Sequence, residues 1–214
     1  MDETEQSHGG ARPVSQILLD LKEEAEKGDL SIGHVVDSLE TRAFGMLLII
    51  FALPVAIPFL YGIPQIVSVP MLMLAGQMVA GREAPWLPEN VRARMLPRQS
   101  FIAVVKRGVP IIRWFEKIAK PRLTLFTGRR AERIIGVFLC IFCASILVPL
   151  PLTNTLPGIA VGIVSIGFIE RDGLIVLAGT ILGTVWVGFL IAVPLGLTAY
   201  TVDQLFFNEG GTAP

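Results

Sequence analysis

The sequence predicts an all-α, polytopic membrane protein, and the distribution of charge is the main reason. Three long stretches, residues 44–81, 134–169 and 173–202, contain no Asp, Glu, Lys or Arg. A soluble domain needs charged outer faces on its helices, whereas a bilayer needs about 20 apolar residues per spanning helix. This pattern excludes a soluble α/β enzyme. The equal numbers of basic and acidic residues, 18 of each, also provide no basic surplus for a nucleic-acid partner.

The chain before the first apolar stretch divides into a tail and two amphipathic helices. Residues 1–13 are polar and lack the basic start and apolar run of a secretory signal, so we expect a retained tail without fixed structure. Residues 14–43 contain two runs with helical spacing of apolar residues, separated at Gly28, and Ser31 is the expected N-cap of the second. Both helices are expected on the cytoplasmic side, at the membrane surface.

Residues 44–81 and 134–172 are predicted to form two membrane hairpins that repeat one another. Each uncharged stretch is too long for one spanning helix and long enough for two, with a proline-rich tip between them. The repeat offset is about 93 residues, and we expect parallel repeats whose charged ends face the cytoplasm. The corresponding prolines are six residues apart in both tips, Pro58 and Pro64 in the first and Pro151 and Pro157 in the second.

Residues 82–133 are predicted to be a cytoplasmic segment at the membrane interface. The segment carries 13 basic residues against four acidic ones, and the positive-inside rule places such a segment in the cytoplasm. Phe101 and Val104 begin an apolar helical face and Lys106 and Arg113 lie on the opposite face, which is typical of an interfacial helix. The alternative is an amphipathic helix packed on a soluble core, which we disfavour because no other segment is expected to supply that core.

The last uncharged stretch predicts one or two membrane helices within residues 173–207, followed by a tail at 208–214. Its 30 residues would measure about 45 Å as one helix, more than the hydrocarbon core of a bilayer. Pro194, together with Gly196, is expected to break it, so that one span covers about 174–193 and a shorter turn follows. The chain therefore has five or six membrane segments, with a cytoplasmic N-terminus.

Uncharged polar residues at the two proline tips form the candidate site. The prolines suit the first turns of the returning helices, whose free N–H groups and positive dipole ends would lie beside the polar side chains. In transporters such broken segments meet at membrane depth and bind polar or anionic groups. The alternative is that the prolines only turn the chain at the periplasmic surface. The predicted substrate-binding residues are Tyr61, Pro64, Gln65, Thr153, Asn154 and Pro157.

The sequence offers little for catalysis, metal binding or a cofactor. His8 and His34 have no Cys or carboxylate neighbours at ligand spacing. Cys140 and Cys143 form a C-x-x-C inside an apolar stretch, where packing is the expected role. No nucleotide-binding or nucleophile motif occurs. We therefore predict a non-enzymatic protein with no cofactor and no metal, and we interpret the charged residues 170–172 as a solvated cap.

Four short motifs follow one another along the chain: R-A-F-G at 42–45, G-R-E-A-P-W-L-P at 81–88, P-L-P-x-x-N at 149–154 and E-R-D-G at 170–173. Together with the apolar blocks around them, they are similar to the exopolysaccharide-synthesis ExoD family of bacterial inner-membrane proteins, over roughly residues 14–206. The resemblance implies location in the bacterial plasma membrane and a link to exopolysaccharide production or export, but no reaction and no catalytic residues.

Two functions remain as hypotheses. The first is a protein that moves, or helps to move, a polar or anionic solute or a lipid-linked saccharide. The second is a structural or regulatory membrane subunit that docks on lipids or on polysaccharide-synthesis enzymes. A membrane enzyme is disfavoured because no acid–base pair exists at membrane depth. Membrane lipids are expected partners, and the G-x-x-x-G pairs at 158–162 and 179–183 serve either packing within the chain or a homodimer.

Overall fold

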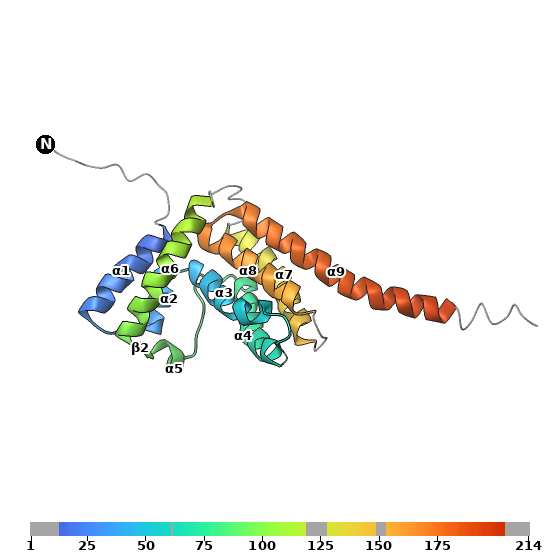
Figure 1. The fold of residues 1–214 in the computed structure, drawn as a ribbon, viewed down its shortest axis with the longest axis horizontal. Coiled ribbons are helices and arrows are strands. Elements are labelled where there is room, and N and C mark those ends of the chain that lie inside the picture. The colour runs from blue at the N-terminus through green and yellow to red at the C-terminus, as the bar shows by residue number, and fades with distance from the viewer. Residues whose placement is uncertain (1–12, 61, 119–127, 149–152, 204–214) are drawn as a thin grey trace, which may run out of the picture.

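The computed structural model describes residues 13–60, 62–118, 128–148 and 153–203, and this part of the chain is almost entirely helical (Figure 1). The all-α prediction is confirmed. One short antiparallel sheet pairs Leu30 with Leu96 and Ser31 with Met95. The elements in order are α1 Val14–Lys27, β1 Leu30–Ser31, α2 Ile32–Leu39, α3 Arg42–Ala56, α4 Ile63–Val79, α5 Glu89–Arg92, β2 Met95–Leu96, α6 Arg98–Ile118, α7 Arg129–Leu147, α8 Thr155–Glu170 and α9 Gly173–Asp203.

Helices α3, α4, α7 and α8 form a bundle in which the two hairpins exchange partners. The first helix of each hairpin packs chiefly on the second helix of the other, so that α3 lies against α8 and α4 against α7. Helix α9 packs on α8 and, less extensively, on α7 (Figure 1). All five helices contribute apolar side chains to one core, whose largest fully buried members are Phe142, Leu48, Met71, Leu139 and Ile146.

Two glycines allow the exchanged helices to approach closely. A Cβ on Gly45 of α3 would lie 2.9 Å from Cγ1 of Ile169 and 2.8 Å from a carbonyl oxygen of α8. A Cβ on Gly136 of α7 would lie 3.1 Å from Cβ of Met78 and 3.0 Å from an amide nitrogen of α4. Small residues permit this backbone contact between membrane helices. The contacts correspond in sequence, because Gly45 and Gly136 are 91 residues apart, as are Met78 and Ile169.

The remaining helices form a module with its own core, so the expectation that no segment could cover the helix in residues 101–119 is wrong. Helices α1 and α6 pack side by side and antiparallel. The backbone N–H of Ser15 donates to Glu116 at the far end of α6, and Arg98 at the start of α6 donates to the Glu26 carbonyl. The buried side chains of this core include Val14, Leu18, Leu21, Ala25, Val36, Leu39, Val105 and Val109.

A second face of α6 stays exposed and apolar. Val104, Ile111 and Trp114 are 67%, 59% and 58% exposed, whereas Val105 and Val109 on the neighbouring face are buried against α1. The sequence pattern predicts a single apolar face for this helix, whereas in the structure Val105 is buried and Val104 is exposed. The interfacial position of α6 therefore remains a prediction, and it now rests on the exposed face alone.

Helix α9 is continuous, which corrects the expected break at Pro194. It contains 31 residues from Gly173 to Asp203 with Pro194 inside it, and its last part extends beyond the bundle (Figure 1). Proline is tolerated inside membrane helices because local adjustments satisfy the freed carbonyl. Among the described residues, α9 is the one helix that by itself is long and apolar enough to cross a membrane, over Gly173–Thr198. Helices α3, α4 and α8 have 15, 17 and 16 residues and are shorter than a typical span.

We expect Gly158→Ala to destabilise the bundle. A Cβ at this position would lie 2.7 Å from Cγ1 of Val55 and 3.0 Å from the backbone of α3, so the helices must move apart, at a cost of about 1–3 kcal/mol. Gly188→Ala in α9 is the matched control, because nothing lies within 4 Å of its Cβ. Thermal unfolding of both purified variants in detergent measures the difference. Equal unfolding temperatures would contradict the packing described here.

Candidate functional site

The described parts of the proline tips, residues 53–60, 62–64, 147–148 and 153–158, lie where the hairpin helices begin their return. Pro64 is the second residue of α4 and Pro157 the third residue of α8, positions where a helix has no internal acceptor for a backbone N–H. Both prolines are buried. The predicted first-turn positions of these two prolines are confirmed.

The two tips lie against each other at one end of the bundle. The backbone at Gly158 touches Val55 and Ala56, the last residues of α3. Helix α9 closes this end from one side, since Nε1 of Trp186 donates to the Thr153 carbonyl at 3.1 Å. Among the tip residues named from the sequence, Pro58 is exposed, and Tyr61 and Pro151 lie outside the described residues.

Two amide side chains at the tips hold oxygen atoms that no described residue satisfies. Oε1 of Gln65 and Oδ1 of Asn154 are both buried and have no hydrogen-bond partner. Asn154 precedes α8, yet its side chain does not cap that helix. A buried acceptor without a donor costs about 1–3 kcal/mol, so each of these oxygens is energetically unfavourable where it lies. Both oxygens are suited to accept a hydrogen bond from a ligand hydroxyl or amide.

The chemistry available at the tips is binding rather than proton transfer. The uncharged stretches around them contain no Asp, Glu, Lys, Arg or His. Their polar groups are amides and hydroxyls, which recognise a ligand by hydrogen bonds and do not titrate near neutral pH. Nor do the described residues elsewhere contain a group of three His, Cys, Asp or Glu side chains placed to hold a metal ion.

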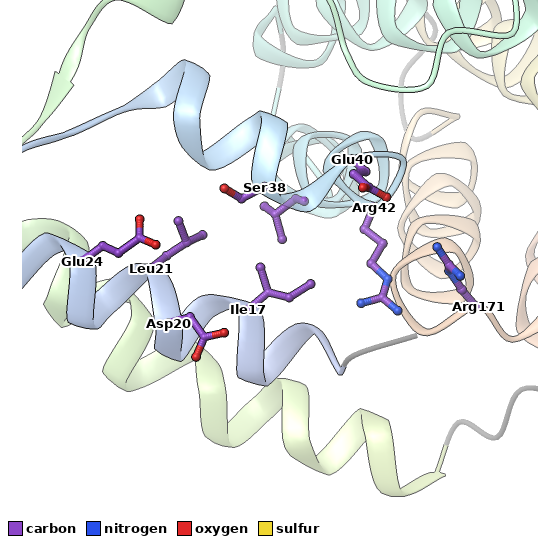
Figure 2. Close-up of a pocket in the computed structure, with 9 residues that line it drawn as sticks. Ile17, Asp20, Leu21, Glu24, Ser38, Glu40, Arg42 and Arg171 are labelled. Carbon is purple, nitrogen blue, oxygen red and sulfur yellow. The ribbon is translucent and has the colours of Figure 1, made fainter. Parts of the chain in front are cut away.

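The opposite end of the bundle is charged and contains a cleft of about 430 Å³. This charged end comprises the start of α3, α7 and α9 and the end of α4 and α8, with the loops beside them. Figure 2 shows the Arg42 side chain extending from α3 into the cleft, with Arg171 beside it and α1 opposite. The lining residues are Ile17, Asp20, Leu21, Glu24, Ser38, Leu39, Glu40, Arg42 and Arg171.

A second cleft of about 390 Å³ adjoins the first, and the two share Glu40 and Arg171. Its other walls come from α2, from the loop after α4 and from the start of α7. Arg129 forms an ion pair with Glu83 at this cleft. Carboxylates and guanidinium groups alternate around both clefts, so the charged end is polar without a strong net charge of either sign.

Glu170 has the most unusual electrostatic environment at the charged end. Burial raises the pKa of this carboxyl to about 7, the nearby Glu116 also raises it, and Arg42 opposes the shift. Glu116 is held in place by α1, because it accepts hydrogen bonds from the backbone N–H of Ser15 at 2.9 Å and from its hydroxyl at 2.7 Å. The end of α8 is therefore electrostatically coupled to the α1–α6 module.

The expected solvated cap at residues 170–172 is only partly correct. Arg171 is exposed, but Asp172 is 3% exposed and accepts a hydrogen bond from the Leu174 N–H at 2.9 Å, which caps the start of α9. Sequence reasoning also missed Arg42 and Glu116 as site residues. The only available signal was that Arg42 stands at the boundary of an uncharged stretch.

The chain resembles known proteins along most of its length. The family described as Exopolysaccharide synthesis, ExoD, matches residues 14–192. The uncharacterized protein slr1875 of Synechocystis is 31% identical over 202 residues, which cover 93% of this chain and 91% of that protein. Protein ExoD of Rhizobium meliloti is 30% identical over 133 residues, which cover 60% of this chain and 54% of that protein. No solved structure matches the chain.

We expect the stability of the wild-type protein to decrease as pH rises from about 5 to 8. The folded Glu170 carboxyl has a pKa of about 7 against an ordinary value of 4.5, so the folded state binds more protons than the unfolded state in this range. Because Glu170 is only partly buried and solvent screens it, the loss should be of order 1 kcal/mol.

The variant Glu170→Gln should lose this pH dependence and be more stable than wild type at pH 8. Glu89→Gln, at an exposed position of α5, is the control and should keep the wild-type profile. Chemical or thermal unfolding at several pH values measures the effect. A wild-type profile that rises between pH 5 and pH 8 and does not respond to Glu170→Gln would contradict it.

Proposed function

The chain belongs to the ExoD family of exopolysaccharide-synthesis proteins, and on this basis we propose that it helps to move a polar solute or lipid-linked saccharide across the bacterial inner membrane. Family membership links the chain to exopolysaccharide synthesis and, together with the apolar α9, indicates association with a membrane. The proposed site of passage is the pair of tips. The observation that supports it best is the pair of buried amide oxygens without partners, on Gln65 and Asn154.

The proposed topology is two re-entrant hairpins beside one spanning helix. A helix of 15 residues is about 22 Å long, less than the hydrocarbon core of about 30 Å, so α3 can enter the bilayer but cannot cross it without thinning it. Helices α4 and α8 are similarly short. The tips would then meet inside the membrane, with α9 crossing beside them and the charged end and N-terminus in the cytoplasm.

The exchange of partners between the hairpins supports an internal two-fold repeat. In such a repeat the α3–α8 contact and the α4–α7 contact are equivalent, and the equivalent glycines, Gly45 and Gly136, occupy the same place in each. Binding sites in repeat transporters lie where the repeats meet. In this chain the meeting place at the uncharged end is formed by the tips.

The hydrogen-bonding groups at the tips favour a hydroxyl-bearing ligand. Unpartnered amide oxygens require donors, and a saccharide offers several hydroxyl donors in a small volume. An anionic group would be held there by uncharged donors alone, because the surrounding stretches contain no basic side chain. We therefore favour the saccharide part of a lipid-linked substrate over a simple anion.

The second candidate function is a regulatory subunit without a transport path. The observation that favours it is the α1–α6 module, which has its own core and exposes Val104, Ile111 and Trp114 on one face of α6. Such a face could dock on a polysaccharide-synthesis enzyme or on the membrane surface. In that function the tips would serve only to turn the chain.

We expect the double variant Gln65→Leu, Asn154→Leu to be more stable than wild type and to lose function. Leucine removes two buried acceptors that lack donors, each costing about 1–3 kcal/mol, so the unfolding temperature in detergent should rise. Without ligand hydrogen bonds, exopolysaccharide output from cells that depend on this chain should decrease about tenfold or more.

The matched control is Asn90→Leu, which changes the same residue type at an exposed position of α5 and should preserve output. Reconstitution in liposomes with a fluorescent lipid-linked saccharide gives a direct readout of movement between leaflets. A stabilised double variant with wild-type output and wild-type lipid movement would show that the tips are only turns.

A further inference from the structure

An apolar groove lies between α7 and α9 on the outside of the bundle. It encloses about 600 Å³ and is separate from the tips and from the clefts of the charged end. Ile134, Ile181 and Val185 on its walls are 60%, 54% and 67% exposed. The lining residues are Arg130, Ala131, Ile134, Ile135, Phe138, Leu177, Thr180, Ile181, Thr184 and Val185.

The two hydroxyl groups in the groove are already satisfied by their own helix. The Thr180 hydroxyl donates to the Val176 carbonyl at 2.8 Å, and the Thr184 hydroxyl donates to the Thr180 carbonyl at 2.8 Å. Such bonds within a helix leave the hydroxyls with little need for an external partner. The wall of the groove therefore behaves as an apolar surface that fits a hydrocarbon chain.

Arg130 stands at one end of the groove and is its only charged lining residue. It is exposed, and among the described residues it makes no ion pair. The nearby carboxylates have other partners: Glu83 pairs with Arg129, Asp172 caps α9, and the charges that act on Glu132 are those of Arg171 and Arg129. The groove thus combines an apolar surface with one guanidinium group that is available to an anion.

We propose that this groove holds an anionic membrane lipid, with one acyl chain along α7 and α9 and the phosphate at Arg130. The argument is charge complementarity. The groove begins at the charged end of the bundle, next to a segment with 13 basic and four acidic residues. The positive-inside rule assigns such a segment to the cytoplasmic side of the membrane, and the lipid headgroups of that leaflet are anionic. From there it continues along α9, the one helix that meets the criteria for a span by itself.

A second copy of this chain is a less suitable occupant. It would have to bring a carboxylate to Arg130, but the apolar parts of α7 and α9 that would meet in such a contact contain none. Two glycines that could have served a helix dimer also pack within the chain, Gly179 on Val164 and Gly183 on Phe142. An anionic lipid supplies both the phosphate for Arg130 and the acyl chain for the apolar wall of the groove.

Native mass spectrometry of the full chain in detergent tests the proposal, with phosphatidylglycerol and phosphatidylcholine of identical chains as probes. We expect wild type to retain one phosphatidylglycerol at about tenfold lower lipid concentration than phosphatidylcholine. Arg130→Gln should reduce this preference to twofold or less while binding of phosphatidylcholine persists. Arg113→Gln, at an exposed position of α6, is the matched control and should keep the wild-type preference.

Filling the groove tests the position of the acyl chain. We expect Thr184→Phe, which places a larger side chain in the groove, to abolish retention of both lipids. If that variant does not fold, Thr180→Leu fills the groove with a smaller change and is expected to weaken retention of both lipids. Three results would each overturn the proposal: equal retention of the two lipids by wild type, an unchanged preference in Arg130→Gln, or disulfide-linked dimers of an Ile181→Cys variant. None of these readouts depends on transport, so the lipid proposal for the groove and the proposed function of the tips are tested independently.

Discussion

In the proposed topology, the requirement that every backbone polar group at membrane depth be satisfied or buried within the protein governs the arrangement of the bundle. Three helices shorter than a typical span, α3, α4 and α8, and two proline-broken tips would each expose unpaired N–H and C=O groups to lipid if they stood alone. The contact between the tips and the exchange of helices between the hairpins would avoid this cost. Gly45, Gly136 and Gly158 allow the exchanged helices to approach closely.

A second level of organisation couples the bundle to the α1–α6 module through charge. Arg42 is only 7% exposed although it begins α3, and burial lowers its pKa, with the neighbouring Arg171 adding to the effect. The carboxyls of Glu170 and Glu116 compensate this buried cation, while Glu116 also binds the start of α1. Interactions of this kind strengthen as water is excluded, so the charges of Glu170, Glu116 and Arg42 link the end of α8 to the helices α1 and α6.

Local signals in the sequence were enough for much of the fold, and the failures have physical causes. Charge-free stretches and prolines located the hairpin helices, and Ser31 caps α2 as expected, accepting from the His34 N–H at 3.2 Å. The pairing of α1 with α6 was missed because the Ser15–Glu116 contact joins residues 101 positions apart, and no local pattern encodes it. The predicted helix break at Pro194 was wrong, because the rule that proline breaks helices comes from soluble proteins and membrane helices tolerate proline.

The amides at the tips are the part of the bundle that folding does not explain. Gln65 and Asn154 begin helices whose other first-turn neighbours, Pro64 and Pro157, are buried and apolar, and leucine at either position would seal the same contact without an unpartnered acceptor. In a protein whose net stability is typically about 5–15 kcal/mol, two such acceptors are a substantial cost. A fold that elsewhere buries apolar groups so completely tolerates them most readily if a donor arrives from outside. The ligand of the proposed function would satisfy this condition, because its donors would remove the cost only while it is bound.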